Sequence, residues 1–155
     1  MKRRLSLLVF TVSISLVIAT TGIGAGSPAT KEVPMKGSGS GQITSFNPGP
    51  NGVAITAEGA GEATHLGRFT RTEEILLNPA TGALIGSITF VAADGSELTC
   101  EFTGNFTGAA TAGGTYTWTG GTGRFADASG AAHFSISQSD PANFTFEFTG
   151  TIELH

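Results

Sequence analysis

The chain has 155 residues, a formal net charge of −4 and 13% charged residues, enough length for one domain with its own core. Its net acidity excludes the dense basic patches with which proteins bind nucleic acid or anionic lipid. Its single cysteine, Cys100, excludes an intrachain disulfide, so the fold must be stabilised by burial of side chains.

The first 25 residues have the order of a secretory signal peptide. Three basic residues at positions 2–4 precede an apolar run over 5–19, and small residues lead up to Ala25. The run is shorter than the ~20 residues of a membrane-spanning helix, so we predict cleavage after Ala25, or alternatively after Ala19, rather than an uncleaved anchor. The mature chain is then expected to be secreted or periplasmic without stable membrane insertion. Loss of three positive charges takes its net charge from −4 to −7.

Residues 26–41 contain two prolines and a Gly-Ser-Gly-Ser-Gly run, a composition that predicts a flexible linker with little apolar surface to bury. The folded domain is therefore expected over residues 42–155, with a first strand near 42–46. The Pro- and Gly-rich segment 47–52 is predicted to break that strand. Residues 53–66 are extended, and we expect their glycines at 59 and 61 to mark a bulge or sharp bend.

The next segments alternate strands with turns. Strands are predicted over 68–77, 83–92 and 97–103. The turn 78–82 separates the first two, and Asp94-Gly95 gives the strongest hairpin signal between the second and third.

The stretch 113–134 is predicted to form a strand, a glycine-rich turn and a returning strand. Tyr116 and Trp118 share one face of the first strand, and threonines occupy the other. The glycines of the turn, Gly120, Gly121 and Gly123, are expected to supply positive φ angles.

The last strand is predicted over residues 143–154, where apolar and polar residues alternate. Phe144, Phe146 and Phe148 share the face that a soluble barrel keeps inside. In total, seven or eight strands follow one another in up-and-down order. The fold class is therefore all-β, an antiparallel closed barrel.

The turn segment 119–130, followed by Asp140 and the strand start 143–150, resembles the Gly-Gly-(Ser/Thr)-Gly-x-Phe hairpin and closing strand of the allene oxide cyclase and dirigent barrels. With the segment 63–70 ahead of it, the chain is also similar to exported bacterial proteins of unknown role. The resemblance implies a calycin-like barrel of eight strands with a ligand-sized interior, and trimeric assembly. It carries over no catalytic residue, because no motif of this chain matches the active sites of those proteins.

Arg71 and Glu73 are the most unusual charged residues, because in a regular strand they lie on the same face as Phe69 and other apolar residues. If the strand is regular, they point into the barrel and would anchor the polar end of a ligand at its mouth, where burial requires that they pair. If Leu76 marks a bulge, both lie on the surface. Of the two, the bulge is the preferred interpretation.

Four further residues are candidates for contact with a ligand. His65 is expected to face inward unless Gly67 resets the register; its role is either a general base or, preferably, a hydrogen-bonded histidine at a strand end. Cys100 is expected to be a small buried hydrophobe. Tyr116 and Trp118 are expected in the core or a cavity wall. No metal site or cofactor is expected, because histidine and cysteine lack ligand spacing.

Three functions are compatible with these patterns. The first is an exported barrel that binds a small, largely apolar molecule in its lumen. The second is a cyclase or isomerase, without metal or nucleotide cofactor, that acts by shaping its substrate. The third is a structural surface module whose eleven phenylalanines fill the barrel. Binding without catalysis is the preferred hypothesis.

Overall fold

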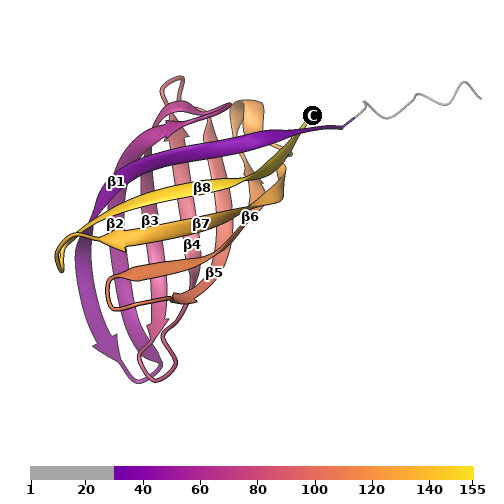
Figure 1. The fold of residues 1–155 in the computed structure, drawn as a ribbon. Helices are drawn as coiled ribbons and strands as arrows, with labels where there is room; N and C mark the ends of the chain where they lie inside the picture. Colours follow the sequence, from indigo (N-terminus) through magenta and orange to yellow (C-terminus); the bar gives the residue numbers. More distant parts are fainter. Residues whose placement is uncertain (1–29) are drawn as a thin grey trace, which may run out of the picture.

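The computed structural model describes residues 30–155, which form a closed, antiparallel, eight-stranded barrel (Figure 1). Neighbouring strands in the chain are neighbours in the barrel, and β8 pairs with β1 to close it. The predicted all-β, up-and-down barrel is thus confirmed. The strands are β1 (Lys31–Gly49), β2 (Gly52–Ala63), β3 (Gly67–Asn78), β4 (Ala83–Ala92), β5 (Glu97–Phe106), β6 (Thr111–Gly121), β7 (Ser129–Gln138) and β8 (Asn143–Leu154).

A single-turn 3₁₀ helix, η1 (Gly123–Phe125), lies between β6 and β7. Among residues 30–155, no helix is long and apolar enough to cross a bilayer. The predicted signal peptide and residues 26–29 lie outside the described residues.

The two ends of the barrel differ. At one end, here called the capped end, lie the turns 64–66, 93–96 and 122–128. The side chain of Phe125 from η1 is fully buried there, and Arg124 donates a hydrogen bond from Nη2 to the carbonyl oxygen of Leu66 at 3.3 Å. At the other end, here called the mouth end, lie the turns 50–51, 79–82, 107–110 and 139–142. Any opening into the interior therefore lies at the mouth end.

The predicted linker is wrong over residues 31–41, which form the first half of β1 and pair with both β8 and β2. The reason is a set of glycine–phenylalanine pairs across the β1–β8 ladder. Gly39 lies opposite Phe146 and Gly41 opposite Phe144. A Cβ atom on these glycines would lie 2.6 and 2.5 Å from the two ring Cζ atoms. The alternate glycines are thus the inward face of a strand and leave room for aromatic rings.

The predicted bulge at Gly59 and Gly61 is also absent, because β2 pairs with β3 without a register shift. These glycines lie opposite Gly41 and Gly39, where β1 approaches closely. A Cβ atom on Gly59 would lie 2.8 Å from the carbonyl oxygen of Ser40. The irregularity lies instead in β1, between residues 43 and 45, and β1 continues through Gly49 before it turns.

The predicted turns at 78–82 and 94–95 are confirmed, and Gly82 (φ 74°) and Gly95 (φ 81°) supply the left-handed conformations that they need. In the turn after β6, Gly120 (φ 100°) and Gly123 (φ 58°) have the expected positive φ angles. Gly121 does not. Its role is close packing, since a Cβ atom there would overlap the carbonyl oxygen of Glu97.

The interior is packed with aromatic rings. Phe90 lies among Phe69, Tyr116, Trp118 and Phe148, with ring centroids 5.3–6.3 Å apart. All five side chains are buried. The capped end and the middle of the barrel are therefore a filled hydrophobic core, and the expected ligand-sized lumen is reduced to its mouth.

Candidate functional site

Arg71 and Glu73 point into the barrel, with exposed fractions of 1% and 3%. The β3 strand pairs with β2 and β4 without any register shift, so no bulge exists at Leu76. The preferred interpretation, which placed both residues on the surface, is wrong, and the inward alternative is correct. The inward position of both side chains follows from the two-residue alternation of a regular strand.

Four groups surround the Arg71 guanidinium. Its Nη2 atom lies 2.5 Å from Oε1 of Glu73, and its Nη1 donates a hydrogen bond to the Tyr116 hydroxyl at 3.2 Å. The guanidinium carbon lies 3.5 Å from the ring centroid of Phe146 and 5.6 Å from that of Phe144. A carboxylate, a phenol and two aromatic faces thus stabilise one buried cation.

The cluster nevertheless has hydrogen-bonding capacity that the protein does not use. Nε and Nη2 of Arg71 and Oε1 of Glu73 are buried without a hydrogen-bond partner, because the ion-pair contact lacks hydrogen-bond alignment. Buried polar atoms without partners are rare in folded proteins and mark strained or functional positions.

A small cavity of about 70 Å³ opens at the mouth end, and Glu73 is its only charged lining residue. Two residues of β3 line the cavity, Glu73 and Ile75. Glu73 lies two positions further from the mouth than Ile75, and so deeper in the barrel. The other lining side chains are mainly apolar and include Ile43, Ile55, Leu84, Ala112 and Ile136. The volume is about that of two water molecules. The cavity is thus an apolar pit with a carboxyl group at its base.

Burial sets the protonation of the groups around this pit. Desolvation raises the pKa of Glu73 above its ordinary value, although the charge of the adjacent Arg71 acts in the opposite direction. Burial also raises the pKa of the Cys100 thiol to about 12 and raises that of the Tyr116 hydroxyl. At neutral pH, Cys100 is therefore a neutral thiol rather than a reactive thiolate, and Tyr116 is a neutral phenol.

Comparisons with known proteins bear on the fold. No protein-family model matches this chain, and no curated protein is significantly similar to it in sequence. Among solved structures, it is similar to the pterocarpan synthase dirigent protein GePTS1, with a TM-score of 0.58 and 14% sequence identity over 83% of this chain and 88% of that chain.

The chain has a dirigent-like barrel fold. At 14% identity the likeness concerns the fold alone. It supports the dirigent part of the predicted resemblance at the level of architecture. The similarity to exported bacterial proteins, the trimeric assembly and the secreted or periplasmic location stay predictions.

The other predicted site residues of the dirigent-like barrel lie away from the cavity. His65 is exposed in the turn after β2, with φ 65°, and its Nε2 lies 3.1 Å from the carbonyl oxygen of Pro34. The expectation that it faces inward is wrong, and the preferred role of a hydrogen-bonded histidine at a strand end matches this contact. Cys100 is buried, and Trp118 donates a hydrogen bond from Nε1 to the Thr151 carbonyl oxygen at 2.9 Å.

Tyr116 is the one remaining candidate that contacts the buried ion pair, through the hydroxyl that accepts from Arg71. The structure therefore brings Arg71, Glu73 and Tyr116 together and leaves His65 and Trp118 outside the cluster. Within residues 30–155, no three His, Cys, Asp or Glu side chains lie close enough to hold a metal ion.

The apolar rim of the mouth was not among the predicted site residues, although Ile136 was expected to face inward with Phe134. Phe106, Ile136 and Ile43 line the cavity from three strands or strand ends. The alternation of residues within each strand indicates that they face inward; Ile136, for example, shares the inward face of β7 with Phe134. Continuing the alternation of inward-facing residues along each strand to its mouth end identifies all three residues.

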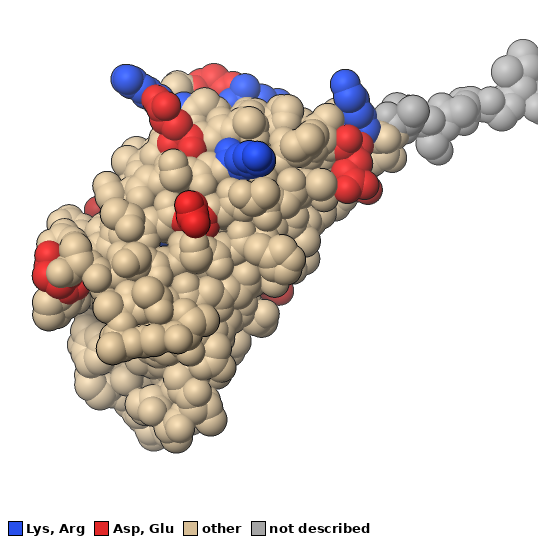
Figure 2. All heavy atoms as spheres, in the orientation of Figure 1, with Lys and Arg blue, Asp and Glu red and all other residues tan. Residues whose placement is uncertain are grey.

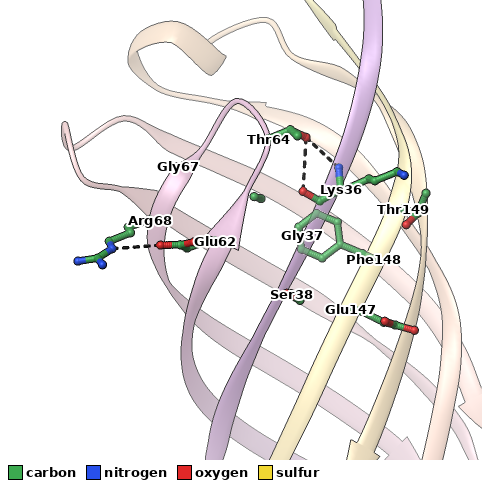
Figure 3. A pocket seen from close by; sticks show the side chains of 11 residues that line it. Lys36, Gly37, Ser38, Glu62, Thr64, Gly67, Arg68, Glu147, Phe148 and Thr149 are labelled. Atoms are coloured by element: carbon green, nitrogen blue, oxygen red, sulfur yellow. Dashed lines mark hydrogen bonds and ion pairs between the residues drawn. The ribbon is translucent and has the colours of Figure 1, made fainter.

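A second hollow lies on the outer surface near the capped end (Figure 3). Arg68 reaches toward Glu62 at 3.1 Å, and Thr64 Oγ1 accepts a hydrogen bond from the backbone N–H of Lys36. Both charged side chains of the pair are largely exposed. This hollow is wide and shallow, with charges of both signs facing solvent, and holds no buried polar group. The mouth cavity is the better candidate site.

Glu73→Gln is expected to flatten the dependence of stability on pH. The folded-state pKa of Glu73 is raised above its ordinary value of 4.5, so the unfolded chain loses this proton at a lower pH than the folded chain. The free energy of unfolding of the wild type, relative to that of Glu73→Gln, should be constant below pH 4.5 and fall as the pH rises above it. Urea unfolding of both proteins over a pH series measures the difference, in which all other titrating groups cancel. A difference that grows with pH would contradict the raised pKa.

Proposed function

We propose that this protein binds a small, largely apolar molecule at the mouth of its barrel, with a polar end of the ligand directed at Glu73 and Arg71. The observation that carries the proposal is the buried ion pair at the base of an apolar cavity, in which Nε of Arg71 has no hydrogen-bond partner. A concave apolar site with a few convergent polar groups is the usual form of a ligand site.

The polar groups suggest the chemistry of the ligand. Nη2 of Arg71 and Oε1 of Glu73 are occupied by their mutual contact, so Nε of Arg71 remains as a donor without a partner, and the carboxyl oxygens of Glu73 retain lone pairs that can accept. A hydroxyl or carbonyl group satisfies these atoms without adding net charge. A carboxylate ligand is disfavoured, because Glu73 lies between the cavity and Arg71 and would repel it when ionised.

The size of the cavity limits how the ligand is held. A volume of about 70 Å³ takes only the polar end of a ligand, because enclosed ligand sites usually measure about 300–1,000 Å³. The apolar remainder would then lie against the rim, formed by Phe106, Ile43 and Ile136.

A substrate-shaping cyclase or isomerase is the second candidate, and one observation favours it. Desolvation raises the pKa of Glu73, a carboxyl group in an apolar pit, which is the direction that a general acid requires. The similar structure GePTS1 is named as a pterocarpan synthase, which shows that a dirigent barrel is compatible with synthesis in that protein.

Ala112→Leu tests the proposed site, because residue 112 is buried and lines the cavity. The larger side chain should fill the pit and weaken binding of the neutral hydrophobic dye N-phenyl-1-naphthylamine by about tenfold or more. Ala131→Leu, on the exposed face of β7, is the matched control and should bind the dye as the wild type does. Fluorescence titration measures both affinities, and thermal melts verify that the variants fold.

Native mass spectrometry of protein purified from its host separates the three functions. A molecule retained by the wild type and lost in Ala112→Leu supports binding. If the wild type converts the recovered molecule to an isomer with a different chromatographic retention, and Glu73→Gln does not, the enzyme is supported instead. No retained molecule together with no dye binding would overturn the proposal and leave a filled structural barrel.

A further inference from the structure

Charge is distributed unequally between the two ends of the barrel. The mouth-end segments of β1 to β6 lie within three stretches, residues 43–57, 75–93 and 102–123, that contain no Lys, Arg, Asp or Glu. Asp140 is the single charged residue in the four turns there, and its carboxylate is held by hydrogen bonds from the backbone and side chain of Asn143. Figure 2 shows the same division, with coloured side chains over the upper part of the molecule and none at its lower tip.

Exposed apolar side chains gather at the same end. Within residues 30–155, the large hydrophobic residues classed as exposed are Phe46 (57%), Ile85 (50%), Phe106 (42%) and Leu76 (36%), and all four lie in the mouth half of the barrel. Phe46 and Phe106 lie at the ends of β1 and β5. An exposed apolar patch of this kind marks a surface that contacts another apolar partner.

The β3–β4 hairpin is apolar on both of its faces. Leu76 and Ile85 are paired on its outer face, while the neighbouring pair Leu77 and Leu84 faces the interior. Leu84 is buried in the core and Leu77 packs against it, so the outer pair is the one left without apolar contact. An occupant that meets the barrel end-on, as a bilayer surface does, would cover this pair together with the exposed Phe46 and Phe106.

The tip of this hairpin satisfies its own backbone donors. The N–H of Ala80 donates to Asn78 Oδ1, those of Thr81 and Gly82 to the Asn78 carbonyl oxygen, and that of Ala83 to Thr81 Oγ1. The remaining tip residue is a proline and has no N–H. Transfer of the tip from water to a less polar environment therefore leaves no backbone N–H without a partner, which lowers the cost of that transfer.

We propose that the mouth end docks on the surface of an uncharged lipid bilayer and seats the β3–β4 hairpin in the headgroup region. Figure 1 shows the β1–β2 and β3–β4 hairpins projecting furthest at this end, with the β7–β8 turn and its Asp140 set back along the barrel. Apolar area drives this association, and the absence of basic residues directs it to zwitterionic rather than anionic lipid. The proposal does not depend on a ligand in the cavity, although it would turn the cavity toward the lipid.

Flotation with phosphatidylcholine vesicles tests the docking. The chain from Gly26 onward is used, because all eight strands of the closed barrel lie within it. The wild type should float with the vesicles, with the same partition coefficient at low and high salt. The double variant Leu76→Ser/Ile85→Ser should lower that coefficient by about tenfold or more. Val91→Ser, on the same outer face of β4 but nearer the capped end, is the matched control and should leave it unchanged.

Each other outcome overturns the proposal. If the wild type does not float, or if the double variant floats equally well, the mouth end does not dock on lipid. If the wild type self-associates without lipid and the double variant does not, the surface is an interface with a second copy. The double variant should still bind N-phenyl-1-naphthylamine, since its two side chains lie outside the cavity, so loss of docking is distinguishable from loss of ligand binding.

Discussion

Arg71→Ala is expected to lower the free energy of unfolding by roughly 3–5 kcal/mol, because removal of one partner leaves a buried charge without compensation. Glu73 would keep its carboxyl group in the interior without its ion-pair partner, and the Tyr116 hydroxyl would lose its donor. Phe146 would also lose the guanidinium that packs on its ring. Chemical denaturation at neutral pH measures the loss.

Arg68→Ala is the matched control for this prediction. Arg68 lies three residues earlier on the same strand and also contacts a carboxylate, that of Glu62, at 3.1 Å. Both side chains are largely exposed, so the change should cost no more than about 0.5 kcal/mol. Equal and small losses in the two variants would mean that Arg71 and Glu73 do not form a buried pair.

Gly39→Val is expected to destabilise the barrel by about 3 kcal/mol, at the upper end of the usual cost of overpacking. A Cβ atom at this position would overlap the carbonyl oxygen of Ala60 and lie 2.6 Å from Cζ of Phe146. Neither the backbone of β2 nor the buried ring can move away without opening the β1–β8 or β1–β2 ladder. Thermal or urea unfolding measures the effect.

Gly49→Val provides the comparison within the same strand. Residue 49 is exposed at the end of β1, and a Cβ atom there would lie no closer than 3.6 Å to another group. Its replacement should therefore change stability by no more than about 0.5 kcal/mol. If Gly39→Val unfolded at the same denaturant concentration as Gly49→Val, the glycines of β1 would not be needed for ring packing.

The glycine–phenylalanine pairs also explain why the candidate site lies at the mouth. Gly86 lies opposite Phe102 and Gly114 opposite Phe134, so the arrangement of β1 and β8 recurs around the barrel. Because each glycine lacks a side chain, the ring across the ladder packs over its backbone. The rings then fill the middle of the barrel, and the small pit at Glu73 lies at its mouth.

Features that depend on short stretches of chain could be predicted from the amino-acid sequence. Asp94-Gly95 and the segment 78–82 specify turns through local backbone chemistry, and the structure has both. Alternation over 143–154 specified the inward face of β8, because the side-chain period of a strand is a property of that strand alone. These local signals were sufficient for the fold class and for the order of the strands.

Features that depend on a distant partner could not be predicted from the sequence and became visible in the folded barrel. Residues 31–41 have the composition of a linker, and Gly39 becomes part of a strand because Phe146, more than a hundred residues later, fills the space beside it. Arg71 and Glu73 are tolerated inside because Tyr116 and Phe146, from β6 and β8, surround the guanidinium. Whether a glycine or a charged residue is tolerated inside the barrel depends on the side chains across the ladder or the lumen. Its neighbours in the sequence do not indicate which side chains those are.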